Sequence, residues 1–344
     1  MVAQGVLSQD KELQELISHF TLPLKSKIPP KTKRKKVIVI SGPTAVGKTP
    51  LSLLVASVLG GEIVSADSMQ VYRNMDIGTA KVSHADRAKV PHHLIDIRDI
   101  TESFNVMDFY MEAMQAIEGT LARNHVPIVV GGTGFYLHSL LSGPPSGPPS
   151  VRQVRTNLED EMNEKGVNVL YERLKNLDPD YAGKITRSDR QKIIRALEII
   201  SLTNKKVSDF SIHSNANQES YDFRCWFVYM PKEILYPKVD LRCEKMIGEG
   251  LVEEVKGLQQ RGLEKNMSAS QAIGYRQCLD FLHSVQSEED WSIFVDSFKK
   301  ASRRYAKRQF TWFRKEPLFR WLNIDNISFE NAAEMLIQDY EQSF

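Results

Sequence analysis

Short apolar runs alternate with longer amphipathic stretches through the first part of the chain. KVIVI at 36–40, EIVSADS at 62–68 and VPIVVGG at 126–132 are too short for helices and rich in β-branched residues, as is typical of buried strands. From 103 to about 123, apolar residues recur at helical spacing instead. This alternation of strand and helix predicts an α/β fold in which helices cover a parallel sheet.

The pattern becomes mainly helical after GPPSGPPS at 143–150, a stretch that can form neither a helix nor a central strand and therefore marks a boundary. Two later apolar runs, FRCWFVYM at 223–230 and FRWLNI at 319–324, predict strands that return to the first sheet. Between and around these strands the spacing of apolar residues predicts helices over 151–165, 167–177, 188–203, 231–262 with a break, 268–283 and 289–315.

These elements predict a catalytic core over 37–142, a helical insertion over 143–222 and a return to the core over 223–344 that ends in a basic helical part. Residues 1–36 are expected to be an extension, with one amphipathic helix over 11–20 and a proline-interrupted basic linker over 25–36. The alternative roles of this linker are an RNA contact and a targeting element.

Composition narrows the class of protein. The chain has 344 residues, of which 42% are hydrophobic and 26% charged, and its net charge is +2, as in an ordinary globular protein. No run approaches the roughly 18 apolar residues of a membrane-spanning helix, and no secretory signal is visible, so we expect a cytoplasmic protein. The three cysteines lack the spacing of a zinc finger or a CxxC motif, and each is expected to be buried and free.

The segment GPTAVGKT follows the first predicted strand and precedes a predicted helix, which is the context of a phosphate-binding loop. In such a loop backbone N–H groups converge on phosphate oxygens, the lysine adds a point charge, and the final hydroxyl suits Mg²⁺. The alternative is a tight turn with an incidental lysine. The expected diphosphate-binding residues are Gly42, Pro43, Thr44, Ala45, Val46, Gly47, Lys48 and Thr49, with Thr49 as the metal ligand.

The loop alone does not predict nucleotide hydrolysis. An NTPase also needs an acid at the end of a buried strand to hold the Mg²⁺ shell, and the strand at 126–132 runs into VVGGTG without one. The strand at 62–68 instead ends at Asp67, where a carboxylate can face whatever lies in front of the phosphates. The alternative for Asp67 is an ordinary turn or cap residue.

Several further motifs, in order, resemble the tRNA dimethylallyltransferase family over about 37–324, and the chain looks like the shorter bacterial type without a C-terminal zinc finger. Besides the loop, the resemblance rests on DSMQVYRNMDIGTAK at 67–81, PHHLID at 91–96, GGTGFY at 131–136, DRQKIIRALEI at 189–199, SASQAIGYRQ at 268–277 and AKRQFTWFR at 306–314. It implies a P-loop NTPase-like core with an inserted tRNA-binding domain.

The resemblance implies transfer of a dimethylallyl group from dimethylallyl diphosphate to the N6 amine of the tRNA adenosine next to the anticodon, with diphosphate as leaving group. It makes Asp67 the base that accepts the amine proton, places Thr44 near both substrates, and directs Arg242 at the diphosphate. Where the family often has a second arginine, this chain has Lys238. A lysine has no guanidinium group and cannot bind the diphosphate in a bidentate manner. Mg²⁺ is the implied cofactor, and the protein is expected to be a monomer.

Matching positions also imply contacts with the anticodon stem-loop, because an adenosine must leave its stack to reach a buried carboxylate. Gln70 has the alternative of a surface helix residue. The implied tRNA-binding residues are Asp67, Ser68, Met69, Gln70, Thr133, Arg155, Gln191, Lys192, Arg195, Arg276, Lys307 and Arg308.

The segment 299–315 carries eight Lys or Arg residues and no acid, with four aromatic residues interleaved. Cations for phosphates and aromatics for bases are typical of nucleic-acid binding. The alternative is a solvated charged face opposite a core face, and both can hold at once. We expect the aromatic side chains to lie in the core: Tyr305, Phe310, Trp312 and Phe313.

Three other functions compete with this prediction. A small-molecule kinase explains the loop but not the missing acid or the basic segment. An enzyme that prenylates free adenine nucleotides shares the loop and Asp67, yet the IGTAK and GGTG forms resemble the tRNA-acting branch. An RNA-binding scaffold with a degenerate loop is disfavoured by the intact Lys48 and Thr49.

Overall fold

The computed structural model describes residues 34–144, 147–210 and 216–342. The helix expected at 11–20, and nearly all of the linker expected at 25–36, lie outside these residues. The described chain forms two compact units. One contains the residues up to Leu141 and from Ala216 onward, and the other lies between Ser142 and Asn215.

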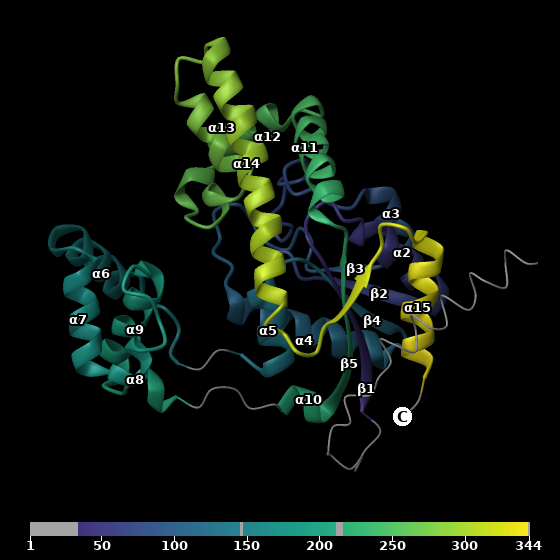
Figure 1. Cartoon of the computed structure of the whole chain (residues 1–344), viewed down its shortest axis with the longest axis horizontal. Coiled ribbons are helices and arrows are strands. Elements are labelled where there is room, and N and C mark those ends of the chain that lie inside the picture. The colour runs from purple at the N-terminus through teal and green to yellow at the C-terminus, as the bar shows by residue number, and fades with distance from the viewer. Residues whose placement is uncertain (1–33, 145–146, 211–215, 343–344) are drawn as a thin grey trace, which may run out of the picture. The chain divides into compact units, whose positions relative to one another are not determined.

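Six parallel strands form the sheet of the first unit, in the order β3-β2-β4-β1-β5-β6 (Figure 1). The three early strands and the return of the two late strands to the same sheet are confirmed. The two-residue β3 was not predicted, so VVGGTG follows the fourth strand and not the third. The strands are β1 (Lys35–Ser41), β2 (Gly61–Ser65), β3 (His92–His93), β4 (Val126–Val130), β5 (Tyr221–Tyr229) and β6 (Arg320–Asn323).

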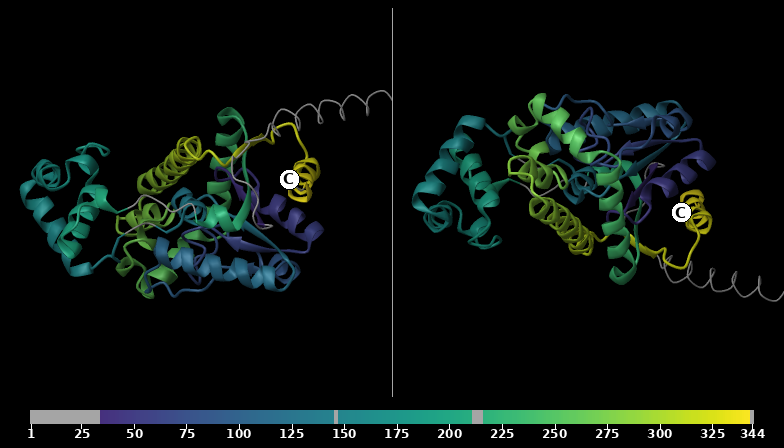
Figure 2. Two further views of the ribbon diagram at one scale, coloured as in Figure 1. Left: turned by 90° about the horizontal axis from the view of Figure 1, so that it is seen from below. Right: turned by 90° about the horizontal axis from the view of Figure 1, so that it is seen from above.

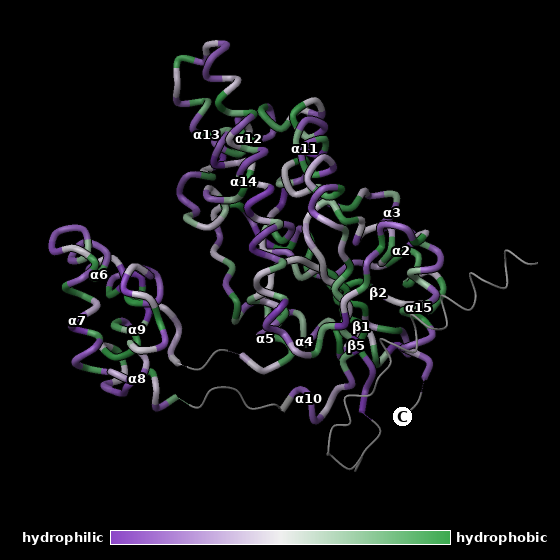
Figure 3. Tube along the Cα trace, viewed as in Figure 1, coloured by the Kyte–Doolittle hydropathy of each residue, from purple (hydrophilic) through white to green (hydrophobic). Residues whose placement is uncertain are grey.

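Both faces of the sheet are apolar, which explains why its strands read as continuous hydrophobic runs. Side chains alternate along a strand, so Val37 and Val39 join one core cluster while Ile38 and Ile40 join another. The first cluster lies under α4 (Val106–Ala122) and α5 (Gly134–Ser142), the second under α2 (Lys48–Leu59) and α15 (Phe329–Glu341). Figure 2 shows these two layers from two further directions, and in Figure 3 the hydrophobic colour gathers in the region where β1, β2 and β5 are labelled.

The helix over 103–123 is confirmed as α4, whose start is fixed by Asn105: its side chain accepts hydrogen bonds from the N–H groups of Met107 and Asp108, and Asp108 caps it in return. The short helices α3 (His84–Lys89) and α10 (Ala216–Ser220) were not predicted. Neither were α5 and α15.

The rest of the first unit is a set of helices made by residues after β5. The predicted break in 231–262 is confirmed at Gly250, whose φ of 103° ends the path of the preceding helix. A continuous helix over 268–283 was wrong, because the Asn266 side chain binds the N–H groups of Ser268 and Ala269 and holds a 3₁₀ turn there. The helices are α11 (Lys232–Gly248), α12 (Leu251–Gln260), α13 (Tyr275–Leu282) and α14 (Glu288–Phe313), with 3₁₀ turns at Leu263–Lys265 and Ala269–Gln271.

The second unit is a small helical bundle with its own apolar core. Buried Glu198 accepts hydrogen bonds from the Ser150 hydroxyl and the Val151 N–H, which fixes the end of the proline-rich stretch against the bundle. The compact unit ends at Asn215, earlier than the expected limit of 222, because Asn217 donates to the Leu140 carbonyl of the first unit. Its elements are α6 (Arg152–Lys165), α7 (Val167–Leu177), α8 (Pro179–Ala182), α9 (Arg190–Thr203) and a 3₁₀ turn at Val207–Asp209.

Candidate functional site

The phosphate-binding loop connects the carboxyl end of β1 to the first turn of α2. Gly47 caps α2 with a φ of 99°, and a Cβ at this position would lie 2.5 Å from the Phe329 ring, so only glycine fits. The Lys48 ammonium folds over the loop and donates to the carbonyl oxygens of Gly42 and Pro43, at 2.9 and 2.8 Å. The loop is therefore already formed, with a cation positioned over it.

The charges around this loop favour an anion. Burial and the neighbouring Arg242 guanidinium lower the pKa of Lys48 to about 7, whereas the Asp67 carboxylate opposes that change. Burial also lowers the pKa of Arg242. Burial disfavours the charged form of both side chains, and Arg242 further disfavours the charged form of Lys48, so an anion bound beside them would be favourable.

Asp67 follows β2 by two residues and has two roles in the geometry. Its Oδ1 accepts hydrogen bonds from the N–H groups of Met69 and Gln70, at 2.9 and 3.4 Å, as a turn-capping residue does. Oδ2 takes part in neither bond, and the residue lines the cavity beside the loop. Asp67 therefore caps the turn after β2 and lines the cavity at the same time.

A cavity of about 300 Å³ opens beside the loop and is enclosed by the first unit alone. Its size is at the lower end of the range for small-ligand sites. Charged and polar groups of the loop region meet an apolar wall there. The charged and polar lining is Thr44, Asp67, Ser68, Thr79, Arg242, Ser268, Gln271, Ser302, Tyr305 and Arg308, and the apolar lining includes Met69, Val239, Met246, Ile273 and Phe298.

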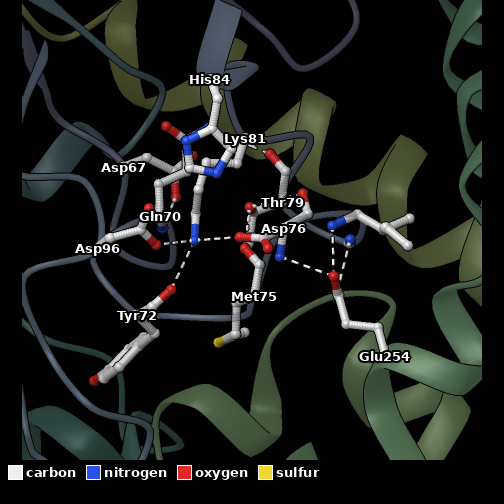
Figure 4. A network of polar contacts seen from close by, with 12 residues as sticks. Asp67, Gln70, Tyr72, Met75, Asp76, Thr79, Lys81, His84, Asp96 and Glu254 are labelled. Atoms are coloured by element: carbon white, nitrogen blue, oxygen red, sulfur yellow. Dashed lines mark hydrogen bonds and ion pairs between the residues drawn. The ribbon is translucent and has the colours of Figure 1, made fainter. Parts of the chain in front are cut away.

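One wall of the cavity, at Gly78 and Thr79, is held by a carboxylate clamp from α12 (Figure 4). Glu254 accepts hydrogen bonds from three successive N–H groups, those of residues 76, 77 and 78, at 2.9, 2.7 and 3.1 Å. It also accepts one from the Tyr275 hydroxyl at 2.6 Å, and Tyr275 lines the cavity too. A Cβ on Gly78 would lie 2.5 Å from the Tyr275 ring, so the backbone and the ring are closely packed in this wall.

Lys81 holds the segment that leads into this wall of the cavity. Its side chain is 2% exposed and its ammonium lies 2.6 Å from carboxylate oxygens of both Asp76 and Asp96 (Figure 4). It also donates to the Tyr72 carbonyl at 2.8 Å. The lysine of the IGTAK motif thus orders the polypeptide that forms the cavity wall.

Sequence reasoning missed Gln309, which joins α14 to the phosphate loop. Its Oε1 accepts a hydrogen bond from the Thr44 N–H at 2.9 Å, and its Nε2 donates to the Gly132 carbonyl at 3.0 Å. It is buried, although it lies in the most basic part of the chain. The signal available was an uncharged polar residue at helical spacing with Ala306 and Phe313 on an apolar face.

The structure brings six of the expected site residues to one cavity: Thr44, Asp67, Ser68, Met69, Arg242 and Arg308. Thr133 lies behind the cavity lining, where its hydroxyl accepts a hydrogen bond from the Ser68 N–H at 3.2 Å. Gln70 lies in a turn, not a helix, and its amide donates to the Thr79 carbonyl at 3.3 Å. Arg276 and Lys307 are exposed outside the cavity lining, and Lys238 contacts the Met230 sulfur.

The other expected RNA contacts lie in the second unit, on or near α9. Arg155 donates to the Gln191 side chain, and Lys192 pairs with Asp189 at 3.2 Å. Arg195 is bound to Glu198 and to the Pro148 carbonyl, so part of its role is to hold the bundle together.

The expectation for the aromatic residues of 299–315 is correct except at one position. Phe313 is buried and Phe310 packs against both core clusters, while Tyr305 is partly buried at the cavity. Trp312 is 39% exposed, so its assignment to the core was wrong. It packs over Gly134 at the rim of the helix layer, where its outer surface meets solvent.

Among the described residues no group of three or more His, Cys, Asp or Glu side chains could hold a metal ion. Thr49, the expected metal ligand, is exposed at the start of α2. All three cysteines are buried and free, as expected. Within the described ranges, no helix has the length and apolar character needed to cross a membrane.

Comparison with known proteins matches residues 70–316 to a family model described as IPP transferase. A protein named tRNA dimethylallyltransferase from Protochlamydia amoebophila is 56% identical over 96% of both chains. The crystal structure of the full-length tRNA isopentenylpyrophosphate transferase from Bacillus halodurans is 38% identical, with a TM-score of 0.65 over 89% of this chain and 95% of that one. A eukaryotic dimethylallyltransferase, whose crystallographic snapshots are described as acting on tRNA, is 30% identical with a TM-score of 0.71, over 87% of this chain and 77% of that one.

Proposed function

The chain belongs to the IPP transferase family, and from this premise we propose that it is a prenyltransferase that moves a dimethylallyl group from dimethylallyl diphosphate to the N6 amine of a tRNA adenosine. The observation that carries the proposal is the cavity in which Thr44 of the phosphate loop, Asp67 and Arg242 meet an apolar wall. Such a cavity suits a small branched hydrocarbon attached to a diphosphate, with an acceptor amine beside a carboxylate.

The leaving diphosphate lies on the loop in this proposal. As the allylic C–O bond breaks, its electron pair passes to the diphosphate, and Lys48, Arg242 and the N-terminus of α2 stabilise the growing negative charge. Thr49 would hold Mg²⁺, which would supply further positive charge to the leaving diphosphate. No phosphoryl group is transferred.

The acceptor chemistry belongs to Asp67. The N6 amine is a weak nucleophile because its lone pair is delocalised into the adenine ring. As its new bond to the allylic carbon forms, the amine loses a proton to the Asp67 carboxylate, which the Met69 and Gln70 N–H groups hold in place. Thr44, whose own N–H is held by Gln309, orients the substrates at the junction.

The acceptor adenosine is the one on the 3′ side of the anticodon, turned out of its stack to enter the cavity. Arg308 at the cavity and the exposed Arg276 and Lys307 contact the RNA from the first unit. Arg155, Gln191, Lys192 and Arg195 contact it from the second. The enzyme works as a cytoplasmic monomer without an obligate protein partner.

One incubation tests the proposal. The purified protein, Mg²⁺ and labelled dimethylallyl diphosphate are incubated with unmodified tRNA, with AMP or with ATP alone. Label is expected in the tRNA, and nuclease digestion should recover it on one adenosine of the anticodon loop. Label in AMP supports the enzyme class that prenylates free nucleotides, and phosphate release from ATP without prenyl transfer supports a kinase or NTPase; either result overturns the proposal.

A further inference from the structure

Two large aromatic side chains of the first unit are exposed side by side. Phe135 on α5 is 46% exposed and Trp312 on α14 is 39% exposed, and their ring centroids lie 6.3 Å apart at an interplanar angle of 73°. Aromatic side chains of this size dominate binding surfaces because they offer a large apolar area with few rotatable bonds.

The Trp312 indole packs against the backbone at the start of α5, although it is partly exposed. It lies directly over Gly134, where a Cβ would come within 2.4 to 2.6 Å of three of its ring atoms. Gly134 follows Thr133, whose hydroxyl holds the Ser68 N–H at the cavity. The aromatic pair therefore lies beside the backbone that leads from Thr133, next to the cavity.

Positive charge surrounds this surface. Lys307, Arg308, Arg314 and Lys315 lie within one or two turns of Trp312 and are all exposed. The nearby acid Glu316 is directed away from those cations into a contact with the His138 ring at 2.9 Å. An exposed aromatic pair among exposed cations complements a base and its phosphates, whereas an apolar protein partner would not need the charge.

The spacing along α14 connects the pair to the cavity. Tyr305 and Arg308 line the cavity, and Trp312 follows on the same helical side. With a helical rise of 1.5 Å per residue, Trp312 lies about 6 Å along the axis from Arg308 and about 10 Å from Tyr305. One or two nucleotides of a single strand span this separation.

We propose that Phe135 and Trp312 form a stacking platform for an unpaired base of the anticodon loop, one or two nucleotides from the adenosine in the cavity. The proposal rests on the proposed function, because it uses that adenosine as its reference point. Stacking on an aromatic side chain tolerates any base, so the platform sets the position of the RNA strand and not its sequence.

The test compares three variants: Trp312→Leu, Trp312→Phe and Trp291→Leu. Trp291 is the matched control, because it is 40% exposed on the same helix but lies at the other end, beside the acids of the first turn. We expect Trp312→Leu to raise the Kd for an anticodon stem-loop RNA and the KM for tRNA about 5-fold to 100-fold, the range for loss of one stacked base. Trp312→Phe should retain most of the affinity, and Trp291→Leu all of it.

The KM for dimethylallyl diphosphate separates stacking from structural damage, since a distorted cavity would raise it as well. Equal losses in Trp312→Leu and Trp312→Phe, a similar loss in Trp291→Leu, or unchanged RNA binding in Trp312→Leu would each overturn the platform. Binding to the stem-loop is measured without dimethylallyl diphosphate. A wild-type protein that binds RNA through Trp312 but prenylates no tRNA would therefore contradict the proposed function and leave the platform standing.

Discussion

At the scale of single residues, Asp67 combines two tasks in one carboxylate: Oδ1 fixes the turn after β2 and the group as a whole faces the cavity. Replacement by alanine would remove both tasks at once, so the loss of the turn cap and the loss of the base could not be told apart. Asparagine keeps an oxygen that can accept the Met69 and Gln70 N–H groups but cannot take a proton from an amine. Asp67→Asn is therefore the cleaner probe of the base.

We expect Asp67→Asn to lower turnover by about 10²-fold to 10⁴-fold, the usual contribution of a general base, and to leave the Kd for tRNA within a few-fold of wild type. Single-turnover prenyl transfer and RNA binding measure the two quantities separately. Turnover within a few-fold of wild type would remove Asp67 from the role of base.

Lys48 should make diphosphate binding depend on pH. In the free protein its pKa is lowered from 10.5 to about 7, and a bound anion favours the charged ammonium and so raises that pKa. Above about pH 7, binding then requires proton uptake, and the affinity falls by up to about tenfold per pH unit until the raised pKa is reached.

The measurement is competitive inhibition by inorganic diphosphate at several values from about pH 7 to pH 9. Lys48→Arg is the control, because its guanidinium stays charged throughout, while the ionisation of the inhibitor itself is common to both proteins. The wild type should show the steeper loss of affinity. Identical pH profiles would mean that the Lys48 ammonium is already fully charged in the free protein.

Sequence reasoning placed single residues correctly where their type and spacing belong to a known motif. It failed where contacts between distant segments of the chain determine the position of a side chain. Gly47, Lys48 and Asp67 were placed correctly relative to the strands. Gln309 was missed because both of its partners, Thr44 and Gly132, come from segments far away in the chain. Trp312 was assigned to the core because it lies on an apolar face of the helix. The periodicity of the sequence does not show how far along the helix that face is covered by another element.

At the scale of elements, the clamp from α12 gives the clearest prediction. Glu254 presents two oxygens to three N–H groups and one hydroxyl. In Glu254→Gln one oxygen becomes an NH₂ group that faces those donors, so we expect the free energy of unfolding to fall by about 1 to 3 kcal/mol.

Chemical denaturation measures this change. Tyr275→Phe is the graded control, since it removes one of the four donors and leaves the carboxylate, and it should cost about 1 kcal/mol or less. A Glu254→Gln protein as stable as wild type would show that the clamp contributes nothing to the fold.

Elements with strong local patterns were predicted well. The strands at 126–130 and 221–229 are β-branched or aromatic runs between polar turns, and α4 has both a cap and a regular apolar stripe. The two-residue β3 exists only through its pairing with β2, so no local pattern indicates it. The region from 268 to 274 has a helix-like composition, but the Asn266 side chain and Gly274 impose a turn.

At the scale of the whole molecule, a net charge of +2 offers little long-range attraction for RNA, so the salt dependence of binding must come from local clusters. Within the basic segment, Arg303 is already paired with Asp240 and Lys299 with Glu244. Lys307 is exposed and, within the described part of the chain, forms no ion pair with an acidic side chain.

We therefore expect Lys307→Ala to reduce the slope of log K against log salt concentration by about 0.7 to 0.9, the value for one lost phosphate contact. Arg303→Ala should change the slope less, because the Asp240 carboxylate already balances its charge. Titrations of tRNA at several salt concentrations measure both slopes. Equal slopes for wild type and Lys307→Ala would exclude a phosphate contact at Lys307.

The position of β1 between β4 and β5 has a consequence for the protein during its synthesis. One edge of β1 can be covered as soon as β4 has left the ribosome, but its partner on the other edge emerges only after the whole helical unit. Arg242 and Gln309, which complete the cavity and fix Thr44, emerge later still. The helical unit, with a core of its own, can therefore fold on the growing chain while the sheet is still open, and the cavity cannot be completed until α14 has left the ribosome.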